Sequence, residues 1–163
     1  MGQLRTPLLK PARAWLLLAL AAFVAVYYVP SLKYPANPPA VGEPATIGQR
    51  TGLYFLMMLI SLGALVFSVG LGRRLIAQYG HLNAMLIGGG AFVALVVIAQ
   101  FILPDINEVP PDFPATVLWK FRMAALCMQA ITWGTIGLLF GFLAERLMQP
   151  ESRRSPPVTA TRE

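Results

Sequence analysis

Long apolar runs alternate with short polar segments along the whole chain. Four of these runs contain no charged side chain, and they cover residues 14–32, 51–72, 75–104 and 123–144. Because about 20 apolar residues of helix cross the hydrocarbon core of a bilayer, each run is long enough to span it. The pattern predicts four transmembrane helices, near residues 14–29, 52–71, 83–103 and 121–143.

The spans are predicted to be helices because they lack the alternating pattern of barrel strands, and because lipid offers no partner to an unpaired backbone donor. The composition, with 56% hydrophobic residues, 12% charged residues and a mean hydropathy of +0.63, is typical of a membrane protein. The predicted fold class is an all-α integral membrane protein, a four-transmembrane-helix bundle with two proline-rich extracytoplasmic loops. Its predicted parts are a cytoplasmic tail (1–13), a four-helix transmembrane domain (14–144) and a disordered cytoplasmic tail (145–163).

The first span has a basic leader, with Arg5, Lys10 and Arg13 before an apolar stretch, and this also fits a secretory signal peptide. A signal peptide would end in small residues at its cleavage site. The stretch instead ends in bulky residues, including Tyr27 and Tyr28. We therefore favour a retained helix and keep the signal peptide as the alternative.

Lysine and arginine residues near the span ends indicate the orientation, because they are in excess on the cytoplasmic side. Nine lie with the two tails and with the connection between the second and third spans: Arg5, Lys10, Arg13, Arg73, Arg74, Arg146, Arg153, Arg154 and Arg162. Four lie on the other side: Lys33, Arg50, Lys120 and Arg122. Both termini are thus predicted to be cytoplasmic. The sequence shows no basic motif with interleaved aromatic residues, so no nucleic-acid partner is expected.

The two segments predicted to face outward, residues 32–51 and 104–122, are rich in proline and contain acidic residues. Proline fixes φ and donates no backbone hydrogen bond, so such segments keep an irregular but stiff path. One interpretation is a shaped outer cap over the helices. The alternative is that the prolines only end helices at the membrane interface, beside aromatic anchors.

Two stretches of this sequence resemble a known family: "VPSLKYPANPPAVGEPATIGQRTGLYFLMMLIS" and "INEVPPDFPATVLWKFRMAALCMQAITWGTIGLLFG". Together with the spacing of the spans, they look like the CbtA family of proposed cobalt transporter subunits, over residues 12–146. The resemblance implies a multi-pass protein of the bacterial inner membrane that takes up cobalt, linked to cobalamin metabolism. It also implies a small single-helix companion of the CbtB type, which carries a histidine-containing motif.

Members of that family usually begin with a further helical hairpin and an acidic, histidine-containing stretch. This sequence begins at Met1, in what corresponds to the loop before the family's third helix. We therefore expect a fragment or a different start, and the missing part is a candidate source of metal ligands.

Few residues of this chain suit cobalt, which accepts imidazole, oxygen and thiolate ligands. His81 lies beside Arg73 and Arg74, which would repel a divalent cation, and Cys127 on an apolar span is expected to pack as a small hydrophobe. One histidine and one cysteine form no nucleophile and base pair, and there is no zinc-protease motif, so no enzyme is predicted. No permanently bound cofactor is expected, and Co²⁺ is the expected transported ion.

The better candidates for cation contact are oxygen atoms on the outer face. The candidate cation entrance consists of Glu43, Asp105, Asn107, Glu108 and Asp112. Clustered, exposed carboxylates raise the local concentration of a cation. The alternatives are a solvated polar loop, or pairing of these acids with the basic residues at the same level.

A candidate intramembrane polar path lies on the fourth span, at Arg122, Gln129 and Thr132. Offsets of seven and three residues place them near one face of a helix. A hydrogen bond between helices is the alternative. Small residues, with Gly137 four residues before Gly141 and a run of three glycines at residues 88–90, predict close helix contacts within the chain or with a partner.

The sequence thus favours a membrane subunit of a cobalt uptake transporter, in contact with lipid and a CbtB-type subunit. The alternative is a non-transporting membrane scaffold or assembly subunit.

Overall fold

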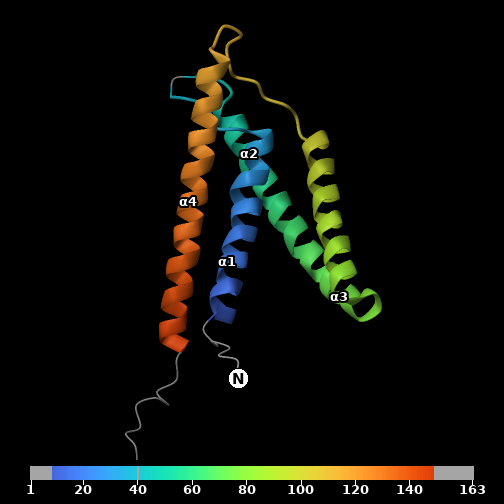
Figure 1. Ribbon diagram of the computed structural model, residues 1–163. Helices are drawn as coiled ribbons and strands as arrows, with labels where there is room; N and C mark the ends of the chain where they lie inside the picture. Colours follow the sequence, from blue (N-terminus) through green and yellow to red (C-terminus); the bar gives the residue numbers. More distant parts are fainter. Residues whose placement is uncertain (1–8, 40, 149–163) are drawn as a thin grey trace, which may run out of the picture.

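The computed structural model describes residues 9–39 and 41–148, and every regular element in these ranges is a helix. The first rod joins α1 (Leu9–Phe23), the π-helical turn η1 (Val24–Tyr28) and α2 (Val29–Lys33). α3 (Ile47–Ile102) and α4 (Ala115–Met148) follow (Figure 1). The predicted all-helical class is therefore confirmed for the described residues.

Three helical stretches in the described part are long and apolar enough to cross a membrane: Ala14–Lys33, Ile47–Ile102 and Ala115–Ala144. Many large apolar side chains on these helices are exposed. Outward-facing apolar side chains are what lipid-facing helices need, so the chain has the character of a membrane protein.

α3 contains both the second and the third predicted spans. As one straight helix, its 56 residues would measure about 84 Å, far more than the roughly 30 Å of a hydrocarbon core. Gly80, with φ 74° and ψ 170°, interrupts it in a conformation that only glycine adopts readily. Figure 1 shows α3 reversing its direction, so residues 47–79 and 81–102 form two arms. The predicted connection between the second and third spans is itself helical except at Gly80.

The helices also begin earlier than predicted. α3 starts at Ile47 rather than near residue 52, and α4 starts at Ala115 rather than near residue 121. The prediction used charged residues as span boundaries, yet Arg50 and Lys120 lie inside these helices. A long basic side chain can reach out of an apolar layer while its backbone remains helical.

The helices also extend into the two predicted tails. α1 begins at Leu9, inside the predicted N-terminal tail, and α4 continues to Met148, inside the predicted disordered tail. The remaining parts of both tails lie outside the described residues.

α1 packs along α4 through small residues. A Cβ atom added at Gly137 would lie only 2.6 Å from Cβ of Ala19, and one added at Gly141 would lie 3.4 Å from Cβ of Trp15. The Trp15 ring also meets the ring of Phe140 edge to face, with 4.8 Å between centroids. The glycine pair predicted to make a helix contact therefore makes it within the chain, against α1.

The two arms of α3 approach each other closely near Gly80. A Cβ atom added at Gly88 would lie 2.9 Å from the carbonyl oxygen of Ser68, and one at Gly72 would lie 3.3 Å from that of Ala84. Small side chains on both arms allow this backbone contact, which replaces the hydrophobic effect as a source of helix association in lipid. Within the predicted glycine run, Gly88 makes the contact, whereas Gly89 has no atom within 4 Å of an added Cβ.

The π-helical turn η1 precedes a buried proline, Pro30. Proline has no N–H, so the carbonyl group of Val26 one turn earlier loses its usual donor. The Tyr54 hydroxyl, 3.5 Å away on α3, donates to it. Nε2 of Gln100 donates to the Val29 carbonyl oxygen at 3.2 Å. The two arms of α3 thus satisfy backbone groups that lipid could not.

The buried core lies where the end of the first rod meets both arms of α3. It consists of Val29, Tyr34, Met57, Val96 and Ala99. Figure 1 shows the start of α1, the end of α4 and the Gly80 turn at one end of the molecule. The connections between α2 and α3 and between α3 and α4 lie at the opposite end.

We expect the contact between α1 and α4 to respond to a swap of one methyl group. Gly137→Ala should lower the free energy of unfolding by about 1–3 kcal/mol, the usual cost of overpacking. Adding Ala19→Gly removes the clashing atom, so the double variant should be more stable than Gly137→Ala alone. Thermal unfolding of the purified protein in detergent, followed by near-UV circular dichroism, measures both. Gly134→Ala is the control because an added Cβ there meets no atom within 4 Å. Equal effects of Gly134→Ala and Gly137→Ala, or a further loss in the double variant, would contradict the packing.

Candidate functional site

The polar side chains predicted to contact a cation gather at the end of the molecule where two irregular segments lie. We call residues 34–46 the first loop and residues 103–114 the second loop. The first loop carries Glu43, and the second carries the other four candidate entrance residues. The structure places both loops side by side, because side chains of each bond to the other.

Glu108 joins the two loops. Its side chain is only 3% exposed, and Oε2 lies 3.2 Å from Nη1 of Arg50 on α3. Its Oε1 atom accepts a hydrogen bond from the Thr46 hydroxyl at 2.6 Å. Gly42 of the first loop comes so close that an added Cβ would lie 3.3 Å from Oε2. The expectation of an exposed carboxylate is therefore wrong for Glu108, because Arg50 and Thr46 compensate its burial.

Asp105 forms a second ion pair of a different kind. Its Oδ1 atom lies 2.5 Å from Nζ of Lys33 at the end of α2, and its side chain is 88% exposed. Next to it, the Tyr34 hydroxyl donates to the Pro104 carbonyl oxygen at 2.8 Å. Burial raises the pKa of Tyr34 above its ordinary value of 10.0, so the hydroxyl keeps its proton and remains a donor at neutral pH.

Two arginines hold three consecutive residues of the first loop. Arg50 donates through Nη2 to the Pro35 carbonyl oxygen. Arg122 on α4 donates through Nε to the Ala36 carbonyl oxygen at 3.3 Å and through Nη2 to Oδ1 of Asn37 at 3.2 Å. The first loop is thus tied to α3, to α4 and to the second loop.

The other three entrance candidates are less constrained. Oδ1 of Asn107 accepts a hydrogen bond from the Val109 N–H at 3.3 Å, within the second loop. Glu43 and Asp112 are exposed. Among the described residues, neither lies within ion-pairing distance of a basic side chain. Their negative charge is therefore not locally neutralised.

The predicted polar path on α4 is not brought together at one point. Arg122 is used by the first loop, as described above. Gln129 is half-buried further along the helix, and Thr132 is exposed and donates to the Met128 carbonyl oxygen of its own helix at 2.9 Å.

The described part of the chain contains no group of three or more histidine, cysteine, aspartate or glutamate side chains that could hold a metal ion. His81 directly follows Gly80, the residue that interrupts α3, and is exposed. Cys127 is also exposed, on the apolar helix α4.

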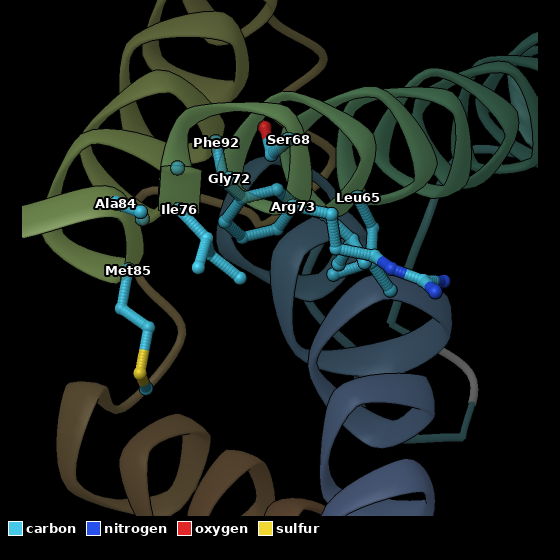
Figure 2. A pocket seen from close by; sticks show the side chains of 11 residues that line it. Leu65, Ser68, Gly72, Arg73, Ile76, Ala84, Met85 and Phe92 are labelled. Atoms are coloured by element: carbon cyan, nitrogen blue, oxygen red, sulfur yellow. The ribbon is translucent and has the colours of Figure 1, made fainter. Parts of the chain in front are cut away.

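A separate cavity of about 340 Å³ lies beside the two arms of α3 near the Gly80 turn. Figure 2 shows Ile76 and Met85 extending from these arms into it, with Ser68 and Arg73 at its edge. The lining is almost entirely apolar, and Arg73 would repel a divalent cation. This cavity therefore does not have the oxygen ligands that Co²⁺ prefers.

Sequence reasoning missed several residues that organise the loop end. Thr46 and Tyr34 act through hydroxyl groups, and Asn37 acts through its amide oxygen. Only the position of Thr46, just before a helix start, could have drawn attention to it. Its hydroxyl donates to Glu108 and is not used to cap α3.

We expect the two ion pairs to differ in their contribution to stability. Glu108→Gln keeps a hydrogen-bond acceptor for Thr46 but leaves Arg50 without a counter-charge, so it should cost about 3 kcal/mol. Asp105→Asn removes a carboxylate that is 88% exposed to solvent, so it should cost less than Glu108→Gln, although the Lys33 side chain is only 9% exposed. The same thermal unfolding measurement in detergent compares the variants. A larger loss for Asp105→Asn than for Glu108→Gln would contradict this assignment.

Comparison with protein-family models matches residues 1–145 to the family described as CbtA, probable cobalt transporter subunit. Comparisons with curated proteins and with solved structures found no match. The family match covers most of the chain and includes both loops and every helix up to the last turn of α4. The resemblance noted from the two loop motifs is thereby confirmed, and the chain belongs to the CbtA family of probable cobalt transporter subunits.

Proposed function

We propose that this chain is a membrane subunit of a transporter that takes up Co²⁺. The family match over residues 1–145 carries the proposal, and the three long apolar stretches support it. The family description names a transport role and a subunit rather than a catalytic activity. The family resemblance implies that cobalt is transported into the cell. It also implies that this cobalt is supplied to cobalamin metabolism.

We further propose four membrane crossings in a bacterial inner membrane, with both termini cytoplasmic and both loops outside. The break at Gly80 supports the count, because each arm of α3 is long enough to cross once. The shared location of α1's start, α4's end and the Gly80 turn supports the sides, together with the excess of basic residues there.

Cysteine labelling tests this topology in a Cys127→Ser background. Asp112→Cys in the second loop should react with an impermeant maleimide in intact cells. Gln78→Cys, exposed near the Gly80 turn, should react only after the membrane is permeabilised. The reverse labelling pattern would overturn the orientation.

The loop end is the proposed cation entrance, formed by the five candidate residues in two different roles. Glu43 and Asp112 keep uncompensated charge and would attract the ion, since exposed carboxylates raise local cation concentration. Asp105, Asn107 and Glu108 shape the loops through their own contacts. Because the described residues do not group three metal ligands, we propose that a histidine-bearing companion of the CbtB type supplies further ligands.

A scaffold or assembly subunit is the second candidate. The observation that favours it is the use of Glu108, Arg50 and Arg122 in contacts that hold loops together. A scaffold of this kind would stabilise a partner in the membrane without carrying the ion. Loss of such a scaffold would lower the abundance of the partner. Removing the charges of Glu43 and Asp112 would not change how the uptake rate depends on cobalt concentration.

Uptake of radioactive Co²⁺ by cells that express this chain with a CbtB-type companion tests the proposal. Glu43→Gln combined with Asp112→Asn should lower the initial rate several-fold at low cobalt, with recovery at high cobalt, because steering acts on capture. The control is Gln49→Ala, which changes an exposed, uncharged side chain at the start of α3 and leaves the charge of the loops as it is, so uptake should not change. Immunoblots of the membrane fraction show whether abundance is equal.

Two outcomes decide between the candidates. No uptake by the unmodified pair, with companion abundance that depends on this chain, would replace the transport proposal by the scaffold. Uptake that is unchanged by the Glu43 and Asp112 substitutions at every cobalt concentration would keep transport and overturn the entrance.

A further inference from the structure

A second cavity at the loop end lies between the first rod and α4, and nothing in the cobalt proposal uses it. Its volume is about 260 Å³, and its lining includes Tyr28, Ser31, Leu32, Arg122, Met123 and Leu126. The polar part of the lining consists of three hydroxyl-bearing side chains and a guanidinium. The rest of the lining is apolar and includes Leu32, whose side chain is exposed.

Arg122 brings a positive charge to this cavity that no acid among residues 9–39 and 41–148 balances. Lys33 is paired with Asp105, and Arg50 is paired with Glu108. Arg122, which is half-buried, donates only to the neutral oxygen atoms of Ala36 and Asn37. Within the described residues, no carboxylate lies within ion-pairing distance of it. Since a desolvated cation without a counter-charge is costly, the complement of this cavity is an anion.

The level of the cavity relative to the membrane indicates which kind of anion binds there. Tyr28 at the cavity and Trp119 one turn before Arg122 are both exposed on the helix surface. Exposed tyrosine and tryptophan side chains typically mark the membrane interface, which is the level of lipid headgroups. Guanidinium groups bind phosphate oxygen atoms with charge-assisted hydrogen bonds.

We propose that this cavity binds the headgroup of an anionic phospholipid from the leaflet on the side of the loops. The phosphate lies against Arg122 and the Ser31 hydroxyl, and the acyl chains lie over Leu32, Met123 and Leu126. The bound lipid supplies the counter-charge that the chain itself does not, and it holds α4 against the first rod beside the first loop.

Binding of phosphatidylglycerol to the purified full chain in a neutral detergent tests this site, with native mass spectrometry as the readout. Arg122→Gln should weaken binding about tenfold, the effect of losing one charge-assisted hydrogen bond of roughly 1.4 kcal/mol. Lys120→Gln is the matched control, because Lys120 is an exposed basic residue two positions earlier on the same helix. It should change the affinity less than twofold.

A second variant separates binding from folding, because Arg122→Gln also removes contacts to the first loop. Leu126→Trp keeps Arg122 and fills the apolar side of the cavity, so it should weaken phosphatidylglycerol binding as well. Diacylglycerol, which lacks the phosphate, should not bind to the unmodified chain at the same concentration. Inorganic phosphate should not displace the bound phospholipid at an equal concentration.

Three results would overturn the proposal. If Lys120→Gln and Arg122→Gln weaken phosphatidylglycerol binding equally, the basic surface as a whole attracts the lipid and the cavity is not its site. Displacement by equimolar inorganic phosphate would assign the cavity to a free anion. A dimer that dissociates on Arg122→Gln substitution, with unchanged phospholipid binding, would assign it to a second copy of this chain.

Discussion

The buried carboxylate of Glu108 is the contact on which the arrangement at the loop end depends. It receives Arg50 from α3 and Thr46 from the first loop, and its Oε2 atom would lie 3.3 Å from a Cβ atom added at Gly42. Away from the loop end, the molecule consists of two helix pairs: α1 with α4, and the two arms of α3. α3 meets the rest of the chain mainly through α2 and η1. The loops add further contacts at this end, because Glu108 of the second loop bonds to Arg50 of α3 and to Thr46 of the first loop.

The same end of the molecule shows how a membrane chain uses a proline inside a span. Pro30 removes a backbone donor, and the helix adapts through the π-helical turn η1. Tyr54 and Gln100, one from each arm of α3, then donate to carbonyl groups of the first rod. These bonds draw both arms to the rod where the buried core lies. Tyr54 and Gln100 therefore contribute to the packing of the helices.

Much of the fold could be predicted from the sequence, and the failures have identifiable physical causes. Charge-free runs located every helix, because lipid excludes unpaired charge. The same signal misplaced the helix starts, since Arg50 and Lys120 are helical residues whose side chains reach polar surroundings. A turn of one residue at Gly80 could not be anticipated, because a positive φ is not visible in composition. The candidate acids were found, but which of them is buried depends on contacts between segments about 60 residues apart, such as that between Thr46 and Glu108.

A double-mutant cycle on Arg50 and Glu108 tests the central claim most directly, because it isolates the energy of one pair from the effects of each single change. The free energy of unfolding in detergent is measured for the parent, Arg50→Gln, Glu108→Gln and the double variant. The account predicts that the two single losses do not add, with a coupling energy of about 1–3 kcal/mol, because either change already breaks the buried pair. Additive losses, with a coupling energy near zero, would contradict the claim that this ion pair ties the second loop to α3.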